Sequence, residues 1–397
     1  MRAIAIQAGG AAFSALVSFV LLVVLARAFG PESFGSYVAL LSVAVLGLIL
    51  IEAGWPTRLY RETVDAALAK TLAESTAIGH AVAHVASVGL VLCLAAWVLG
   101  GATRLAASLA FGCMILLALS NLVAARIRGH GRFALDTLWQ CSGRLASAAL
   151  ILFVIMQFPA TAELVFAGWS VAVAVLLLLW GRFWLAPPRW RGLAGDYRYV
   201  LPFLAINGGS VFLLRGDMSL LGAFDLPPTD LSFYAAGTRF TEAAVLLFAA
   251  VTNVLFRTFR LRVHDAILFR RELRFALALA LGAGIPALIA SVLLGQFVMT
   301  QVFGPEYRAA GDLLPWITAS LPLMLVNLVL IQAAAARDRE ARVAGYVFFA
   351  CALLASGLYL GSMFHGIRGA AAGVFAAHGV LVVMLLWLVL RNRGAST

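Results

Sequence analysis

Three arginines, Arg144, Arg215 and Arg239, lie inside stretches of sequence that are otherwise apolar. A guanidinium at the depth of the hydrocarbon core costs about 2.5–3.5 kcal/mol on insertion scales, so such a residue usually faces a water-filled cavity or a charged partner. Its planar fork of N–H donors suits carboxylates and phosphates. These three positions therefore indicate where the chain handles a polar group, and by charge an anionic one.

Two of these arginines, Arg215 and Arg239, lie on consecutive apolar segments and at a similar distance from the turn between them. At about 1.5 Å of rise per residue, both lie roughly 10–12 Å below the outer surface. A pair of guanidiniums at one depth suits a diphosphate, because each can bind oxygens in a bidentate fork. The alternative is internal neutralisation: Glu242 shares a helical face with Arg239, and Asp217 could meet Arg239 across the hairpin. Both interpretations remain open at this point.

Arg144 and two further charged residues are candidates for a role in the same chemistry. Arg144 lies about 9 Å into its segment from the cytoplasmic side, where it either snorkels to the interface or contacts an incoming diphosphate. Arg27 ends the first apolar segment, a position typical of an interface anchor. Glu52 ends the second segment, where we expect it to pair with Arg58 or Arg61, or alternatively to serve as a proton-coupling site.

Two histidines, His80 and His84, are four residues apart and therefore share one face of a helix. This spacing permits a metal ion, but the neighbouring sequence offers no third ligand of the kind that completes a site. We therefore expect a buried or cavity-lining polar pair, with no metal and no cofactor. Four cysteines, which all fall within apolar segments, are expected to pack as small hydrophobic side chains: Cys93, Cys113, Cys141 and Cys351.

The elements that position these residues are predicted to be membrane-spanning helices. The 397 residues are 63% hydrophobic and 12% charged, far from the roughly 25% charged residues of soluble domains. Apolar runs of 18 or more residues recur along the chain, and each is long enough to cross a bilayer. We predict an all-α polytopic membrane protein whose first span is retained. The twelve expected spans cover residues 4–27, 35–55, 76–99, 104–125, 138–157, 163–183, 199–222, 231–255, 274–303, 311–335, 343–364 and 369–390.

The net charge of +11 is a topology signal and does not indicate nucleic-acid binding. With twelve spans and a cytoplasmic N-terminus, 22 of the 29 basic residues fall in cytoplasmic segments, four fall outside and three are embedded. The positive-inside rule then predicts that both termini lie in the cytoplasm. We expect a multi-pass protein of the cytoplasmic, or inner, membrane, with some arginines near anionic headgroups of membrane lipids.

The midpoint of the chain is expected to be a linker. Residues 184–198 are hydrophilic, and Pro187 and Pro188 forbid a continuous helix there. We predict two six-helix bundles, residues 1–185 and 199–397, joined by a cytoplasmic linker at 186–198. Both halves begin and end in the cytoplasm, which is the parallel-repeat arrangement. A weak internal echo supports this division, because Ala-Phe, then Pro, then Phe and Tyr recur at 28–37 and 223–234.

Several short patches resemble a known family. They are residues 25–37, followed by Glu52-Ala53-Gly54 and Arg61-Glu62; residues 303–314; and Tyr234-Ala235-Ala236 with Arg239 and Glu242. They look like Wzx-like polysaccharide biosynthesis flippases of the multidrug/oligosaccharidyl-lipid/polysaccharide exporter superfamily. The patches are mostly turn and helix-end chemistry, so they indicate the fold better than the substrate.

The resemblance implies two six-helix bundles around a central cavity, with Arg27 near that cavity. It also implies alternating access, in which a lipid-linked oligosaccharide or polysaccharide precursor is flipped across the membrane. The partners would be a polyprenyl-diphosphate-linked glycan, membrane lipids and polysaccharide assembly proteins. A cation-coupled multidrug-type exporter is the alternative, followed by a polysaccharide polymerase or ligase. We expect that the protein is not an enzyme, because the sequence has no paired catalytic carboxylates in a sizeable external loop. It also has no Walker motif, so we expect that it does not hydrolyse ATP.

Overall fold

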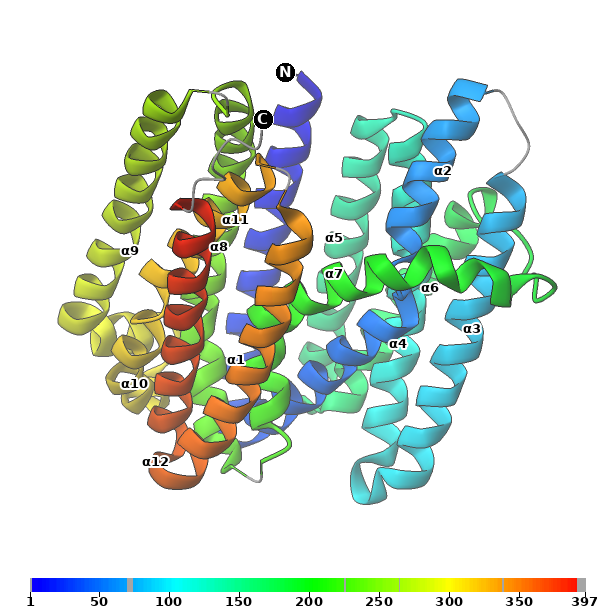
Figure 1. Ribbon diagram of the computed structural model, residues 1–397. Helices are drawn as coiled ribbons and strands as arrows, with labels where there is room; N and C mark the ends of the chain where they lie inside the picture. The colour runs from blue at the N-terminus through cyan, green and yellow to red at the C-terminus, as the bar shows by residue number, and fades with distance from the viewer. Residues whose placement is uncertain (1, 70–73, 225, 264, 338, 391–397) are drawn as a thin grey trace. The chain divides into compact units, whose positions relative to one another are not determined.

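The regular elements of the protein are helices. The computed structural model describes residues 2–69, 74–224, 226–263, 265–337 and 339–390, and no strand occurs in these ranges (Figure 1). The predicted all-α class is therefore confirmed. The helices are α1 (Arg2–Glu52), α2 (Trp55–Ala69), α3 (Glu74–Leu99), η1 (Gly101–Thr103), α4 (Arg104–Gly129), α5 (Phe133–Gln157), α6 (Ala162–Leu179), η2 (Gly181–Phe183), α7 (Leu193–Leu221), α8 (Pro228–Leu261), α9 (Ala266–Phe303), η3 (Pro305–Tyr307), α10 (Arg308–Thr318), α11 (Leu321–Ala335) and α12 (Glu340–Leu390).

The observed helices accommodate all twelve predicted spans. Eight helical stretches of the described residues are long and apolar enough to cross a membrane. Two of them each contain two predicted spans, because α1 is kinked at Gly30 and α12 at His365 and Gly366. The remaining two predicted spans fall on α7 and α8, helices of 29 and 34 residues that are not among these eight and that carry the charged residues Arg215 and Arg239. The protein is therefore a multi-pass membrane protein.

Close backbone contacts explain why α12 is a hairpin of two spans. At Gly366 the backbone has φ = 59°, a conformation that glycine adopts without the steric cost of a side chain. A Cβ atom at Gly361 would overlap the backbone of Gly369, and one at Gly373 would overlap Gly357. Small residues at such positions let helices approach closely, which is a common basis of helix association in membranes.

Helix α2 lies between the predicted spans 35–55 and 76–99, in a stretch for which no helix was predicted. The chain breaks after α1, where Ala53 and Gly54 have positive φ of 45° and 84°, and then forms the helix. Trp55 and Leu59 on its inner face are buried. An amphipathic helix has too few apolar residues to be recognised as a membrane span, and for this reason the search for apolar runs in the sequence did not find α2.

The described chain forms two compact units. The first contains Met1–Phe29 and Leu40–Gly208, and the second contains Gly30–Ala39 and Gly209–Thr397. In the first unit, Val123, Ile127 and Trp139 belong to a buried apolar cluster. In the second, a larger cluster is built from α8, α9, α11 and α12. The functional division into 1–185, 186–198 and 199–397 remains a prediction.

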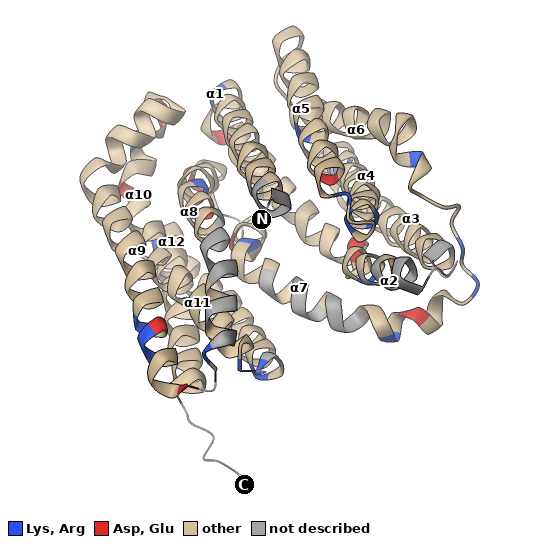
Figure 2. Ribbon diagram, turned by 90° about the horizontal axis from the view of Figure 1, so that it is seen from above, with Lys and Arg blue, Asp and Glu red and all other residues tan. Residues whose placement is uncertain are grey.

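Charged residues are sparse on the helices. Figure 2 shows long uncharged stretches of ribbon, with most of the blue and red segments near helix ends. The basic side chains of Lys70, Arg391 and Arg393, which were assigned to cytoplasmic segments, lie outside the described residues. The few charges within helices α7 and α8 are therefore the exception that needs a structural account.

Candidate functional site

The second unit brings Arg215 and Arg239 together at one carboxylate. Arg239 Nη1 donates a hydrogen bond of 2.8 Å to Glu242 Oε2, and Arg215 Nη2 lies 3.7 Å from the same oxygen. Glu242 is three residues after Arg239 on α8, so both share a helical face. Helices α7 and α8 are joined by a short turn, and this places Arg215 at the depth of Arg239. The predicted approach of the two arginines is thus observed, together with the predicted Glu242 ion pair.

This arrangement leaves guanidinium donors in excess. Two arginines offer ten N–H donors, and one carboxylate cannot satisfy more than a few of them. The Nε atom of Arg239 is buried and has no hydrogen-bond partner. The side chain of Arg215 is 49% exposed, whereas Arg239 and Glu242 are about four-fifths buried. The site therefore retains capacity for a further anion.

Asp217 is directed to a different partner from the one we expected. Its Oδ2 atom accepts a hydrogen bond of 2.8 Å from the Tyr234 hydroxyl, and its Oδ1 atom accepts one of 2.8 Å from the Met218 amide. The carboxylate is buried, and its hydrogen bonds go to Tyr234 and Met218 instead of Arg239. Because Asp217 is two residues after Arg215, it points to another side of α7, where α8 presents Tyr234.

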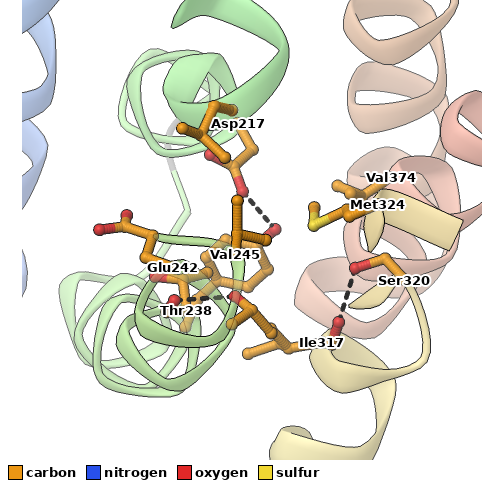
Figure 3. A pocket seen from close by; sticks show the side chains of 11 residues that line it. Asp217, Thr238, Glu242, Val245, Ile317, Ser320, Met324 and Val374 are labelled. Carbon is orange, nitrogen blue, oxygen red and sulfur yellow. Dashed lines mark hydrogen bonds between the residues drawn. The ribbon is translucent and has the colours of Figure 1, made fainter. Parts of the chain in front are cut away.

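A small pocket opens beside Asp217. Figure 3 shows Asp217 of α7 and Thr238 and Val245 of α8 facing Ser320 and Met324, while the carboxylate of Glu242 points away from Met324. The pocket volume is about 10 Å³, which is room for roughly one water-sized particle. In this state the pocket cannot hold a sugar.

Hydroxyl groups give this pocket an acceptor character. Thr238 donates to the Ala235 carbonyl at 3.0 Å, Thr241 to the Thr238 carbonyl at 2.8 Å and Ser320 to the Ile317 carbonyl at 2.8 Å. A hydroxyl that already donates its proton presents lone pairs to anything else. The polar part of the lining therefore consists of hydroxyl oxygens and the carboxylates of Asp217 and Glu242, a set that suits a water molecule or a small cation, while the rest of the lining is apolar.

The other two candidate arginines belong to the first unit. Arg27 lies near the end of the first span, before the kink of α1, and Arg144 lies on α5, and both side chains are exposed. Gln140, four residues before Arg144 on the same helix, donates a hydrogen bond of 2.9 Å to Asp136. Asp136 is buried and also accepts from Gln7 of α1 at 3.2 Å.

Glu52 has a neutral partner. The Asn121 amide donates to Glu52 Oε1 at 2.5 Å, which links the end of α1 to α4. Arg58, which was expected to pair with Glu52, instead binds Glu62 at 2.7 Å and Asp196 at 3.0 Å. The side chain of Arg61 lies outside the described residues. The position of Glu52 near the end of a helix gave no indication that Asn121 would be its partner, because the two residues are 69 positions apart in sequence.

The histidine pair of α3 is buried and fully hydrogen-bonded, which confirms the predicted polar pair. His80 contacts Asp196 and the Arg191 carbonyl, and His84 contacts Tyr197 and the Leu50 carbonyl. Among the residues described, no three His, Cys, Asp or Glu side chains lie close enough to hold a metal ion.

Two asparagines form hydrogen bonds between helices. Asn121 binds Glu52, and Asn327 donates to the His378 carbonyl at 3.2 Å, which links α11 to α12. The side chains of Asn207 and Asn253 lie outside the described residues.

The fold is similar to that of solved transporters, some of which are described as members of the MOP superfamily. A multidrug resistance MATE family transporter in an inward-facing conformation matches with a TM-score of 0.73 at 14% sequence identity, covering 94% of this chain and 93% of that chain. The lipid II flippase MurJ in an inward closed conformation matches with a TM-score of 0.74 at 12% identity, covering 96% and 86%. A MOP superfamily transporter from Pyrococcus furiosus, described as having a binding pocket of reverse polarity, matches with a TM-score of 0.60 at 14% identity, covering 98% and 94%.

No family model and no curated protein sequence matches the chain. At these sequence identities the structural likeness shows the fold alone. The kind of fold implied by these sequence patches is thereby observed, and the Wzx-like branch stays a prediction.

Proposed function

We propose that the protein flips a polyprenyl-diphosphate-linked oligosaccharide or polysaccharide precursor across the cytoplasmic membrane by alternating access. In this proposal Arg215 and Arg239 bind the diphosphate while the polyprenyl tail stays in the lipid. The observation that carries the proposal is the convergence of two guanidiniums, one from α7 and one from α8, on one carboxylate oxygen, at 3.7 Å and 2.8 Å.

The charges of the site favour exchange of Glu242 for a phosphate group. Two guanidiniums face one carboxylate, and the nearby Asp217 carboxylate takes its hydrogen bonds from Tyr234 and Met218. A diphosphate carries at least two negative charges and several acceptor oxygens, so it matches the pair better than a single carboxylate does. We propose that Glu242 holds the arginines in place between transport cycles and releases them when the substrate arrives.

The first unit supplies further candidate contacts. Arg144 would meet the incoming diphosphate on the cytoplasmic side, and Arg27 would lie further along its path. The similarity of the fold to a lipid II flippase supports a lipid-linked substrate, although it does not select one glycan.

The test is transport of a fluorescent polyprenyl-diphosphate oligosaccharide in proteoliposomes that contain the purified protein. We expect Arg215→Ala and Arg239→Ala each to slow flipping by at least about ten-fold, which is the effect of losing roughly 1.4 kcal/mol of binding to the diphosphate. Arg308→Ala is the matched control, because Arg308 is an exposed arginine at the start of α10. If Arg215→Ala and Arg239→Ala both leave the rate of flipping unchanged, the proposal that these two arginines bind the diphosphate is wrong.

A second candidate function is cation-coupled export of small molecules. It is favoured by the acceptor-lined pocket around Asp217, Tyr234 and Thr238, and by the similarity of the fold to a multidrug resistance transporter. Its test is efflux of a fluorescent cationic dye from proteoliposomes under a Na⁺ or H⁺ gradient. Gradient-driven efflux that Asp217→Asn abolishes, without any flipping of the lipid-linked glycan, would favour this function over the first.

A further inference from the structure

The segment that follows α6 is fastened along one side of α3 within the first unit. The Arg189 amide donates to the Gly79 carbonyl at 2.9 Å, and its guanidinium donates to the Thr76 hydroxyl at 3.2 Å. The Trp190 indole donates to the Ser87 hydroxyl at 3.2 Å. A Cβ atom at Gly79 would lie only 3.0 Å from the Pro187 carbonyl, so the segment packs directly against the helix. We call residues 186–197 the linker segment.

His80 is held between two hydrogen-bond acceptors of this linker segment. Its Nδ1 atom lies 2.6 Å from Asp196 Oδ2, and its Nε2 atom lies 2.8 Å from the Arg191 carbonyl. A carbonyl oxygen accepts only, and so does an ionised carboxylate. A neutral imidazole has one N–H group and can satisfy one of the two, whereas an imidazolium donates to both. The geometry therefore matches the protonated ring.

The Asp196 carboxylate is ionised in this arrangement. Burial raises its pKa, but the hydrogen bonds from His80 and Arg58 outweigh that effect, and the pKa is lowered on balance. Arg58 Nη2 lies 3.0 Å from Asp196 Oδ1, and its Nη1 atom donates to the Asp196 carbonyl at 3.1 Å. Asp196 thus joins α2, α3 and the start of α7.

His84 provides a contrast one turn further along the same helix. Its Nε2 atom lies 3.1 Å from the Leu50 carbonyl, and its Nδ1 atom lies 2.9 Å from the Tyr197 hydroxyl. Because a hydroxyl can donate to Nδ1, a neutral imidazole with its proton on Nε2 satisfies both contacts. The two histidines therefore share a face but differ in the number of protons that their partners require.

We infer that His80 is a proton-dependent latch that fastens the linker segment to α3. When His80 carries two protons, it holds both Asp196 and the Arg191 carbonyl. When it loses one as the pH rises, the remaining N–H stays with the Asp196 carboxylate and the Nε2 lone pair faces the Arg191 carbonyl oxygen. That contact becomes repulsive, and the segment is released next to Gly192.

Among the charged and titratable groups around the latch, His80 is the one whose change of charge we propose to control it. The neighbouring basic side chains are arginines, a residue type that does not lose its proton in proteins. The pKa of Asp196 is lowered, so this carboxylate keeps its charge until the pH falls below the ordinary value of about 3.9. The remaining groups close to the latch are Glu62, which pairs with Arg58, and His84 and Tyr197, which bind each other. An imidazole is the side chain whose charge ordinarily changes between about pH 5 and 8.

The test is hydrogen–deuterium exchange of the linker segment in the full-length protein, from about pH 5.5 to 8.5, with protection corrected for the intrinsic exchange rate. Because one proton is linked to closure, we expect protection of the wild type to fall with rising pH by up to about ten-fold per pH unit. His80→Gln should lower protection at acid pH and abolish the pH dependence. His84→Gln is the matched control and should keep the dependence.

A wild-type protein whose corrected protection does not change across this range overturns the latch, and this outcome needs no variant. The latch is also overturned if His80→Gln keeps the wild-type pH dependence. Asp196→Asn leaves the His80 ring in place and replaces an obligate acceptor with an amide that can donate to Nδ1, so that a neutral ring satisfies both contacts. It should likewise flatten the pH profile.

Discussion

Replacing Glu242 with glutamine should tighten the binding of a diphosphate. In the structure Glu242 Oε2 accepts a 2.8 Å hydrogen bond from Arg239 and lies 3.7 Å from Arg215. Glutamine keeps the size and shape of the side chain and removes its charge. An incoming diphosphate would then no longer compete with a fixed carboxylate for the two guanidiniums.

The size of the effect follows from the geometry of the ion pair. Two unit charges about 4 Å apart attract by roughly 4 kcal/mol at an effective dielectric constant of about 20. Desolvation offsets much of this attraction, and a hydrogen bond to a charged group contributes about 1.5–3 kcal/mol net. At about 1.4 kcal/mol per factor of ten, the Glu242→Gln protein should bind a diphosphate roughly ten- to one-hundred-fold more tightly.

The assay is isothermal titration calorimetry, which measures the dissociation constant of a soluble short-chain polyprenyl diphosphate from the purified protein. Arg239→Ala should change affinity in the opposite direction, and Glu306→Gln, which alters an exposed carboxylate in the turn after α9, should leave it unchanged. Equal or weaker binding by the Glu242→Gln protein would refute the idea that Glu242 occupies the place of the diphosphate.

Three further predictions concern stability. Tyr234→Phe removes the hydroxyl that donates to buried Asp217, so the free energy of unfolding should fall by about 1.5–3 kcal/mol, measured by thermal unfolding in detergent. Gly361→Ala forces a methyl group into a facing helix backbone and should cost about 1–3 kcal/mol, whereas Gly282→Ala, which has open space around it, should be nearly neutral in the same assay. Asp196 has a lowered pKa, so its contribution is present above about pH 3.9 and is lost as the pH falls through the lowered value. Asp196→Asn should therefore weaken the fold near neutral pH and reduce its loss of stability in an acid titration; an unchanged acid profile would contradict this.

The partners of the charged residues show how far local sequence patterns reach. The Arg239–Glu242 pair was predictable, because residues three apart on a helix are neighbours wherever that helix lies. The partner of Asp217 was not predictable, because Tyr234 lies on the next helix and the rotation of α8 about its axis brings it there. The partners of Glu52 and His80 were not predictable either, because Asn121 and Asp196 are 69 and 116 residues away from them in sequence.

The sequence by itself determined that this is an all-α protein with spans of membrane length, and it singled out the embedded arginines, because apolar length and charge are properties of a local stretch of chain. Only the tertiary structure decided that Arg215 and Arg239 converge on one oxygen, that Asp217 binds Tyr234 and that His80 lies between two acceptors. These contacts depend on which helix faces mate and on the directions of their side chains. Packing between distant segments sets both the helix faces that meet and the side-chain directions, and the local hydrophobicity of the sequence carries no information about that packing.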